Sequence, residues 1–470
     1  MTGHRVEKDT LGKVKVPLEA YYGPQTQRAR ENFSVSGIRL QRKFIRAQGI
    51  LKEAAAKANT KLGVLDEKKG KAIMRAAREV SDGRFDEHFV VDVYQSGAGT
   101  SQNMNANEVI ANRAIEIVGG EIGNYALVHP NDHVNMAQSS NDTIHVAMHI
   151  SAVEAMKMEL IPALDDLRRA LRKKSREFND IVKPGRTHMQ DAVPITLGQE
   201  FSGYAAMAKK GIKRLKAAED SLREINMGAT AVGTGLNTHP DFAPTSVREI
   251  SRITGLSFRL PDNPFEAAHN TDAAVEASGA LKTVAVGLTK MANDLRLLSS
   301  GPRAGLGEIT LPAVQPGSSI MPGKVNPVMA EMLNMACFQV MGNDATISYA
   351  GQAGQLELNV MMPVIAYNLL NSIEILAGAV RAFTERCIKG ITADAERCAE
   401  LADRSMALAT ALAPKIGYER AAEVAKKAYT KGKSVKEVAI KEGLITEKEA
   451  KKLLDPKKMT KVQSKSYKRL

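Results

Sequence analysis

The stretch LKTVAVGLTKMANDLRLL, residues 281–298, decides the fold, because its pattern predicts a long helix that is apolar on more than one face. A helix of this kind must be covered on several sides. Helical spacing recurs elsewhere, at Leu160, Leu164, Leu167 and Leu171 and again at Met329, Leu333, Ala336 and Val340. We therefore expect long helices that cover one another, and association of subunits to cover the faces that remain apolar.

The long-helix pattern occupies most of the middle of the chain. It is found near residues 145–178, 196–226, 266–300, 328–350 and 360–387. Pro162 should kink or restart the first of these helices, since proline removes a backbone donor and its ring clashes with the preceding turn. Helices of such length usually pack as a bundle, so the sequence predicts an all-α fold.

The pattern changes twice along the chain, which predicts three domains. Residues 1–138 mix short helical patterns with loops, residues 139–395 carry the long helices, and residues 396–470 form a small helical region. In that last region Ser434 to Glu437 and Thr446 to Glu449 each fit a capping box before a short helix. Such a pair of helices can also bind DNA, but a small helical appendage is the favoured interpretation.

The chain has 470 residues, 44% of them hydrophobic, and a net charge of +13. The charge suits either an ordinary solvated surface or the steering of anions toward a site. Nucleic acid is the other common partner of a basic protein. Because the basic residues are spread along most of the chain and only 4% of residues are aromatic, we expect no nucleic-acid partner.

The cysteines and the N-terminal residues bear on the compartment. Cys337, Cys387 and Cys398 are odd in number and not closely spaced, which argues against a disulfide framework or a zinc site. The first residues, MTGHRVEKDT, contain no apolar signal region. No apolar run approaches the ~18 residues of a membrane span. We expect a cytoplasmic protein with no membrane contact.

Polar, glycine-containing stretches adjoin the long helices and are candidates for a site. They are SGAGTSQN (96–103), HPNDHVNMAQSSND (129–142), KPGRTHMQD (183–191) and PGSSIMPGKVNP (316–327). The last is one residue too long for a phosphate loop, with Val325 where a metal-binding hydroxyl would stand. Gly97 and Gly99 begin a possible dinucleotide fingerprint, but Gln102 replaces its third glycine. The chain has no HExxH or CxxC motif, so we expect neither a metal nor a cofactor.

The donors in these stretches suit a carboxylate. The neutral ones are Thr100, Ser139, Ser140, Asn141, Thr187 and Asn326, and Lys324 supplies a positive charge. Helix N-termini after the loops would add backbone donors for an anion. For any single residue, capping of the following helix is the favoured explanation. The presence of several such loops in one chain favours a site.

His188, Glu331 and a serine loop are candidates for the chemistry. His188 lies between Arg186 and Asp191 in a predicted loop, and Glu331 lies just inside the helix after the Lys324 loop. Glu331 either interacts favourably with the helix macrodipole or raises the basicity of His188. Ser318 and Ser319 lie in a glycine-bounded loop that either closes over a substrate or is a flexible connector.

Together these stretches resemble the fumarase and aspartase superfamily, and GSSIMPGKVNP at 317–327 is close to its signature. The resemblance runs from about residue 8 to near residue 460 and is nearest to class II fumarate hydratase, the iron-independent kind. It implies an all-α fold with three domains. It also implies a homotetramer whose central helices form one bundle, with each active site built from loops of three subunits.

The alternative within the superfamily is aspartase, an aspartate ammonia-lyase. Fumarases typically read QSSND, GRTH, NTHP and MPGK, as this chain does at 138–142, 185–188, 237–240 and 321–324. Aspartases typically read QSTND, GRTQ, NTP and MPAK, so His188 is the discriminating position. AGQLELNVMMPVI at 353–365 is more like aspartase, and His145 stands near a position where fumarases often have proline.

The resemblance implies reversible hydration of fumarate to (S)-malate, without a cofactor. Ser318 would take the carbon-bound proton, and His188 paired with Glu331 would handle the water. We assign stabilisation of the enediolate to Lys324 and Asn326. The residues expected to bind substrate are Ala98, Gly99, Thr100, Ser139, Ser140, Asn141, Thr187, Ser319, Lys324, Val325 and Asn326. His129, Pro130, Asn131 and Asp132 correspond either to a second dicarboxylate site or to a capped turn without a ligand.

A protein of another class, non-catalytic and structural on the same fold, is the remaining alternative. The presence of all the polar residues that the chemistry requires argues against this alternative. They are Thr100, Ser140, His188, Ser318, Lys324 and Glu331.

Overall fold

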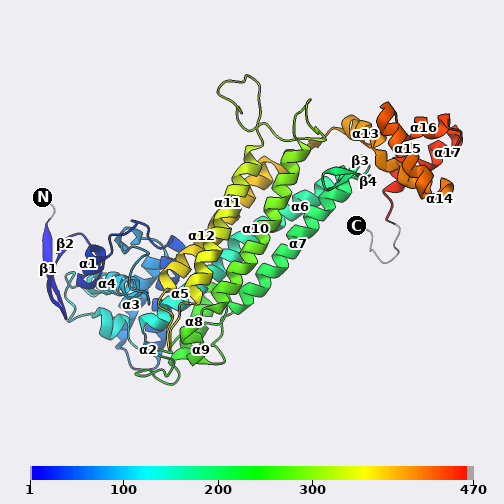
Figure 1. Cartoon of the computed structure of the whole chain (residues 1–470). Helices are drawn as coiled ribbons and strands as arrows, with labels where there is room; N and C mark the ends of the chain where they lie inside the picture. Colours follow the sequence, from blue (N-terminus) through cyan, green and yellow to red (C-terminus); the bar gives the residue numbers. More distant parts are fainter. Residues whose placement is uncertain (1–2, 463–470) are drawn as a thin grey trace. The chain divides into compact units, whose positions relative to one another are not determined.

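The structure is a computed structural model that describes residues 3–462 (Figure 1). Its chain divides into two compact units. Unit 1 comprises Met1–Pro162, Lys213–Ala285 and Cys337–Ala377, and unit 2 comprises Ala163–Ile212, Val286–Ala336 and Gly378–Leu470. The three-domain boundaries expected from the sequence stay a prediction.

The first part of the described chain combines a hairpin with helices of mixed length. In chain order the elements are β1 (His4–Asp9), β2 (Gly12–Pro17), α1 (Pro24–Asn32), α2 (Arg42–Lys61), α3 (Glu67–Ser81), α4 (Thr100–Ile117), α5 (Ser140–Ala155), α6 (Ile161–Glu177), β3 (Val182–Thr187), β4 (Gln190–Thr196), α7 (Leu197–Ser221), α8 (Phe242–Thr254) and α9 (Pro264–His269).

The remaining elements are long helices followed by a run of short ones. They are α10 (Asp272–Leu298), β5 (Ile309–Thr310), α11 (Val328–Gly351), α12 (Met362–Arg386), β6 (Thr392–Ala393), α13 (Ala395–Arg404), α14 (Ala413–Ile416), α15 (Tyr418–Lys431), α16 (Val435–Lys441), α17 (Glu447–Leu453) and α18 (Pro456–Met459). The predicted long helices are confirmed, and the chain belongs to the all-α class.

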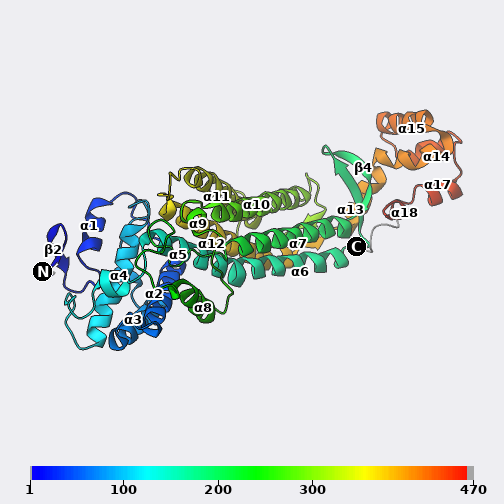
Figure 2. The ribbon, with the colours of Figure 1, turned by 90° about the horizontal axis from the view of Figure 1, so that it is seen from below.

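Long helices run beside one another (Figures 1 and 2), and polar contacts join neighbouring helices within each unit. In unit 2, the Tyr204 hydroxyl of α7 donates to Asp294 Oδ2 of α10 at 2.8 Å. In unit 1, the Ser278 hydroxyl of α10 donates to Asp344 Oδ1 of α11 at 2.9 Å. Asn343 of α11 in turn donates to the hydroxyl of Ser372 on α12 at 3.0 Å. Neighbouring helices are therefore held in register by buried polar groups.

The apolar stretch at residues 281–298, which lies in α10, is buried along most of its length. The buried apolar side chains are Leu281, Val284, Ala285, Leu288, Met291, Ala292, Leu295 and Leu298. Val286 remains 53% exposed and Leu297 37% exposed. The expectation of an extensively apolar helix holds, and a minority of its apolar surface is left uncovered within the described chain.

Pro162 interrupts the first long helix, as the sequence predicts. The α-helical hydrogen bonding of α5 ends at Ala155, and a wide π-helical turn over Met156–Leu160 precedes α6. A proline cannot donate to the carbonyl one turn earlier and its ring crowds that carbonyl. A π turn relieves this by widening the helix locally.

Unit 1 is built around α2, which packs beside α3, α5 and α8. Its core draws on Ile73, Val80, Val109 and Ile110 of α3 and α4, among other residues of these elements. The last helices in unit 2 pack around a separate small core that includes Leu412, Val424 and Val435. The two predicted capping boxes, at Ser434 and Thr446, are both present there.

Short strand pairs add to the helical fold, and one replaces a predicted loop. β3 and β4 form an antiparallel hairpin over KPGRTHMQD, with Thr187 opposite Gln190. Only His188 and Met189 lie between the strands, and both have positive φ, 53° and 62°. Positive φ at both central residues is the mark of a type I′ turn, whose twist matches that of paired strands.

One helix contradicts the expectation that no apolar run approaches membrane length. Within residues 3–462, the segment Met362–Gly390 alone is long and apolar enough to cross a membrane. In its most apolar window, 61% is buried inside the structure, and the core helix of a soluble protein passes the same test. Length and composition therefore do not assign this helix to a membrane.

Candidate active site

The predicted donors of unit 1 come together at the N-terminal ends of two helices. Thr100 is the first residue of α4 and Ser140 the first residue of α5, and the Ser140 hydroxyl donates to Thr100 Oγ1 at 3.1 Å. Asn141 donates from Nδ2 to the Ala231 carbonyl at 2.8 Å. Unpaired backbone N–H groups at such helix starts favour an anion. The cluster can therefore bind one carboxylate group.

Glycine is required just before α4 for steric reasons. A Cβ at Gly97 would lie 1.8 Å from the Val360 carbonyl oxygen, and one at Gly99 would lie 2.7 Å from the Ile144 side chain. Gly99 also has a φ of 70°, where side chains are disfavoured. Ala98 is half-buried between them. Gly99 thus lets the start of α4 approach α5, and Gly97 lets the preceding loop approach the backbone of Val360.

Ser139 caps α5 and shares this role with a buried carboxylate. Its hydroxyl accepts the Asn141 N–H at 3.2 Å, and its own N–H donates to Asp142 Oδ1 at 3.0 Å. Asp142 Oδ2 accepts the N–H groups of Gly228 and Thr230 at 3.2 and 3.0 Å. Burial raises the pKa of Asp142 to about 7, against the lowering effect of these hydrogen bonds. The interpretation of Ser139 as a helix cap is thus correct. The cap also orders the neighbouring donors, Ser140 and Asn141.

His188, the residue predicted to handle the water, lies in unit 2 at the tip of a hairpin. His188 occupies the first turn position between β3 and β4, and it is exposed together with Thr187. Histidine is one of the few non-glycine residues that adopt positive φ with any frequency. The turn therefore presents the imidazole to solvent rather than packing it into the core.

The hairpin is anchored by a buried carboxylate that the sequence analysis missed. Glu308, which is 0% exposed, forms ion pairs with Lys183 Nζ at 3.0 Å and Arg186 Nη1 at 2.9 Å. Lys183 also pairs with Glu200 at 2.8 Å. Two basic residues close together in KPGR, Lys183 and Arg186, could have indicated an acidic partner. Nothing in the sequence identified Glu308 as that partner.

The signature loop, residues 317–327, is closed by hydrogen bonds between its two ends. The Gly317 N–H donates to the Lys324 carbonyl at 2.8 Å, and Asn326 Nδ2 donates to the Gly317 carbonyl at 2.5 Å. A Cβ at Gly317 would lie 2.4 Å from that Lys324 oxygen. Lys324 and Val325 are exposed, and Ser319 is exposed as well. The loop thus holds one lysine side chain out toward solvent.

Ser318 accepts two hydrogen bonds within this loop. Its Oγ receives the N–H of Ile320 at 3.1 Å and that of Met321 at 2.8 Å. These donors stabilise negative charge on Oγ. The same geometry is an ordinary serine turn, so it supports the predicted role without requiring it.

The predicted pairing of His188 with Glu331 does not form within one chain. Glu331 lies half-buried in the first turn of α11. Among residues 3–462 no hydrogen bond or ion pair joins His188 to Glu331, Ser318 or Lys324. The pair stays a prediction.

The predicted second dicarboxylate site is a capped turn. His129 Nδ1 accepts the N–H groups of Asn131 and Asp132, both at 3.2 Å, and Pro130 is buried below them. Because Nδ1 is an acceptor here, the ring proton of neutral His129 resides on Nε2. Occupation of this turn by a dicarboxylate stays a prediction.

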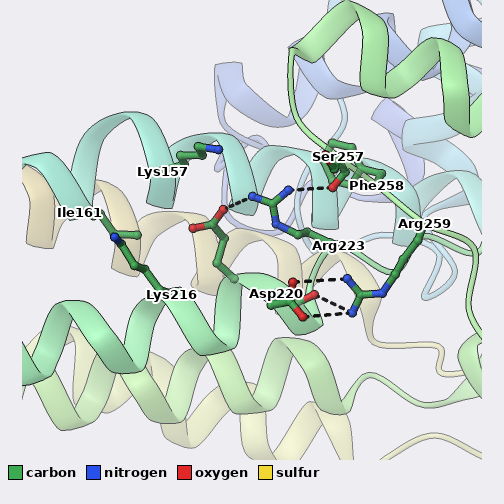
Figure 3. Close-up of a pocket in the computed structure, with 9 residues that line it drawn as sticks. Lys157, Ile161, Lys216, Asp220, Arg223, Ser257, Phe258 and Arg259 are labelled. Carbon is green, nitrogen blue, oxygen red and sulfur yellow. Dashed lines mark hydrogen bonds and ion pairs between the residues drawn. The ribbon is translucent and has the colours of Figure 1, made fainter.

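A cavity of about 620 Å³ in unit 1 lies apart from these residues (Figure 3). Its lining is Lys157, Ile161, Lys216, Glu219, Asp220, Arg223, Ser257, Phe258 and Arg259. The guanidinium groups are already engaged, Arg223 with Glu219 at 2.6 Å and Arg259 with Asp220 at 3.4 Å. None of the predicted site residues lines it, so size alone does not locate the chemistry.

Comparison with known proteins defines the class to which this fold and these donors belong. A family described as lyase matches residues 12–342, and one described as fumarase C C-terminus matches residues 408–461. The long helices and the polar loops thus belong to a chain of the lyase family. The chain belongs to the fumarase/aspartase superfamily.

Relatives with two activities are similar to the whole chain. Fumarate hydratase class II 2 of Bradyrhizobium diazoefficiens is 54% identical over 97% of this chain and 97% of its own length. Aspartate ammonia-lyase of a Bacillus species is 50% identical over 98% of both. The crystal structure of the class II fumarase of Schistosoma mansoni, 40% identical, matches with a TM-score of 0.95 over 97% of this chain and 99% of that one.

Proposed function

We propose that this lyase is a class II fumarate hydratase that interconverts fumarate and (S)-malate. Fumarate hydratases at 50–54% identity dominate among the similar relatives, although aspartate ammonia-lyases at 49–50% identity are also similar. The observation that supports the proposal is His188 at the exposed tip of the β3–β4 hairpin, in the form GRTH. An imidazole there can take a proton from the attacking water or give one to the departing hydroxyl, which a glutamine cannot do.

The reaction removes a weakly acidic proton beside a carboxylate, so the dianionic enediolate must be stabilised. Lys324 and Asn326 supply that stabilisation, and the Thr100–Ser140–Asn141 cluster binds a carboxylate of the substrate. A preorganised donor of this kind is worth roughly 3–4 kcal/mol of barrier when it is removed from comparable sites. The exposed ammonium of Lys324 is free to approach a diacid that is bound by another subunit.

Ser318 takes the carbon-bound proton in this proposal. A neutral hydroxyl is a weak base and needs help. The two backbone N–H groups on Ser318 Oγ and the nearby positive charge of Lys324 provide it. His188, with Glu331 of a neighbouring subunit, then delivers a proton to the departing hydroxyl.

The active form in this proposal is a homotetramer with shared active sites. Within residues 3–462 no hydrogen bond or ion pair joins His188 to the loop at 317–327, which supports a site completed by neighbouring subunits. Helix α11 leaves Met335 65% and Phe338 56% exposed, which suits a helix that packs against another copy. The protein is soluble and cytoplasmic in this proposal, and the turn at His129–Asp132 is a second dicarboxylate site.

Aspartate ammonia-lyase is the second candidate, favoured by the 50% identity to the Bacillus enzyme. One assay distinguishes the two activities. The purified full chain is given malate alone, and in a separate reaction aspartate alone, without added metal, and fumarate formation is followed by absorbance. We expect fumarate from malate only. Fumarate from aspartate but not from malate would reject the proposal.

A further inference from the structure

A buried amine lies beneath the carboxylate-binding cluster of unit 1. Lys52, on α2, is 0% exposed. Its Nζ donates to Asn135 Oδ1 at 2.9 Å and to Gln138 Oε1 at 3.0 Å. Burying an ammonium group is costly unless it is well paired and hydrogen-bonded, so this lysine requires an explanation.

The acceptors of Lys52 belong to the segment that leads into the substrate-binding residues. Asn135 Nδ2 donates to the Gln138 carbonyl at 3.1 Å, and Gln138 Nε2 donates to the Val134 and Met136 carbonyls at 3.1 and 3.0 Å. Ala137 between them has a φ of 62°, a conformation disfavoured for alanine. The lysine thus fixes a strained turn that ends immediately before Ser139.

The same network reaches the start of α4. Asn135 Oδ1 also accepts from Asn103 Nδ2 and Asn107 Nδ2, both at 3.1 Å. Asn103 Oδ1 accepts the hydroxyl of Thr143, in the first turn of α5, at 3.1 Å. One amide oxygen therefore links Lys52 to both helices whose N-termini carry Thr100 and Ser140.

Asp142 supplies the negative charge that is opposite to the positive charge of Lys52. It is 1% exposed and its carboxylate joins Ser139 to the turn at Gly228–Thr230. The carbonyl of the next residue, Ala231, accepts a hydrogen bond from Asn141. No direct ion pair joins the two groups in the described chain. Burial lowers the pKa of Lys52 to about 7, and the charge of Asp142 opposes that lowering. Each charge partly offsets the desolvation of the other.

We infer that Lys52 and Asp142 are positioning residues for the substrate carboxylate, acting through Gln138 and Ser139. Neither touches substrate. They hold Ser140 and Asn141 in the geometry that accepts a diacid, and the inference rests on the proposed function. Removing Lys52 should loosen binding in the ground state and the transition state alike, which raises KM and changes kcat less.

The test compares variants of the full-length protein. Lys52→Met keeps most of the length of the side chain and removes both hydrogen bonds. We expect it to raise the KM for malate at least tenfold and to weaken binding of succinate, measured by calorimetry, by a similar factor, with kcat within about threefold of the unmodified protein. Lys57→Met on the same helix is the matched control, since Lys57 pairs with Glu249 at 2.8 Å outside the network.

A second variant keeps the inference testable if Lys52→Met does not fold. Gln138→Leu removes an acceptor of Lys52 and is expected to raise KM in the same way. The double variant should be no worse than Lys52→Met alone, because both changes break one pathway. KM and succinate affinity within twofold of the unmodified protein in folded Gln138→Leu or Lys52→Met would overturn the inference. An unmodified protein that is inactive on malate yet binds succinate would instead reject the proposed function alone.

Discussion

At the scale of the residue, backbone conformation and burial decide what each histidine can do. His188 is exposed at a turn with positive φ, so its imidazole is available to water and substrate. His145 and His149 are buried on α5 with ring centroids 4.0 Å apart. His149 Nδ1 lies 2.7 Å from the Glu224 carbonyl and donates to it. The exposed imidazole can carry chemistry, whereas the buried pair belongs to the core.

Replacing His188 by asparagine tests its chemical role without disturbing the turn. Asparagine adopts positive φ readily, so the hairpin should persist. We expect kcat for malate dehydration to fall by about 10²–10⁴, the usual contribution of a general acid or base. Met189→Asn is the control, since Met189 has the same conformation and is 63% exposed. Near-normal turnover by His188→Asn would contradict the role.

The buried imidazoles predict a loss of stability in mild acid. Burial lowers the pKa of His149 to about 4, whereas an unfolded chain protonates it near 6.5. Below pH 6.5 the unfolded state therefore binds a proton that the folded state excludes, and stability falls by about 1.4 kcal/mol per pH unit until pH 4. Urea denaturation at several pH values should show a shallower dependence for His149→Phe. Equal slopes for the two proteins would refute this.

At the scale of the element, the β3–β4 hairpin shows how a buried ion cluster supports an exposed functional tip. Lys183 and Arg186 of β3 both pair with Glu308, which lies just before β5. A carboxylate shared by two cations in a dry site is costly to remove, since the cations are left buried. The position of Thr187 and His188 thus depends on a residue more than a hundred positions along the chain.

The substitution Glu308→Gln should destabilise unit 2 markedly. Loss of one partner from a buried ion pair typically costs about 3–5 kcal/mol, and we expect that effect in chemical denaturation. Glu385→Gln removes a carboxylate that pairs with Lys389 at an exposed helix surface, where the expected change is about 0.5 kcal/mol or less. Similar small effects of both substitutions would show that Glu308 does not anchor the hairpin.

At the scale of the whole molecule, the predicted functional groups are distributed over both units. Thr100, Ser140 and Asn141 lie in unit 1, whereas His188, Ser318 and Lys324 lie in unit 2. Helix α11 combines a buried face with large exposed apolar side chains at Met335 and Phe338. In the proposed homotetramer those side chains are covered, and neighbouring chains complete each active site.

A charge on the exposed face of α11 should therefore disrupt both assembly and activity. We expect Phe338→Glu to shift the sedimentation coefficient from tetramer to smaller species, and malate turnover to fall with the loss of shared sites. Tyr429→Glu introduces the same charge at an 80% exposed aromatic residue of α15 and should change neither. A fully active monomer of Phe338→Glu would contradict the shared-site proposal.

The sequence was sufficient for the elements whose signals are local. Periodicity predicted the long helices, Pro162 predicted the break between α5 and α6, and the capping boxes at Ser434 and Thr446 predicted two short helices. The β3–β4 hairpin was predicted as a loop, because a two-residue turn without glycine carries little hairpin signal. Lys52 was missed because a lysine in a helical pattern is normally solvated.

By itself, the sequence determined the helical class, the family and the set of polar side chains available for chemistry, since each follows from the order of nearby residues. Only the tertiary structure decided that Lys52, Asp142 and Glu308 are buried and which groups they hold. The physical reason is desolvation. A charge becomes costly, and so must be paired, when distant segments close over it, and the order of residues does not show which segments will meet.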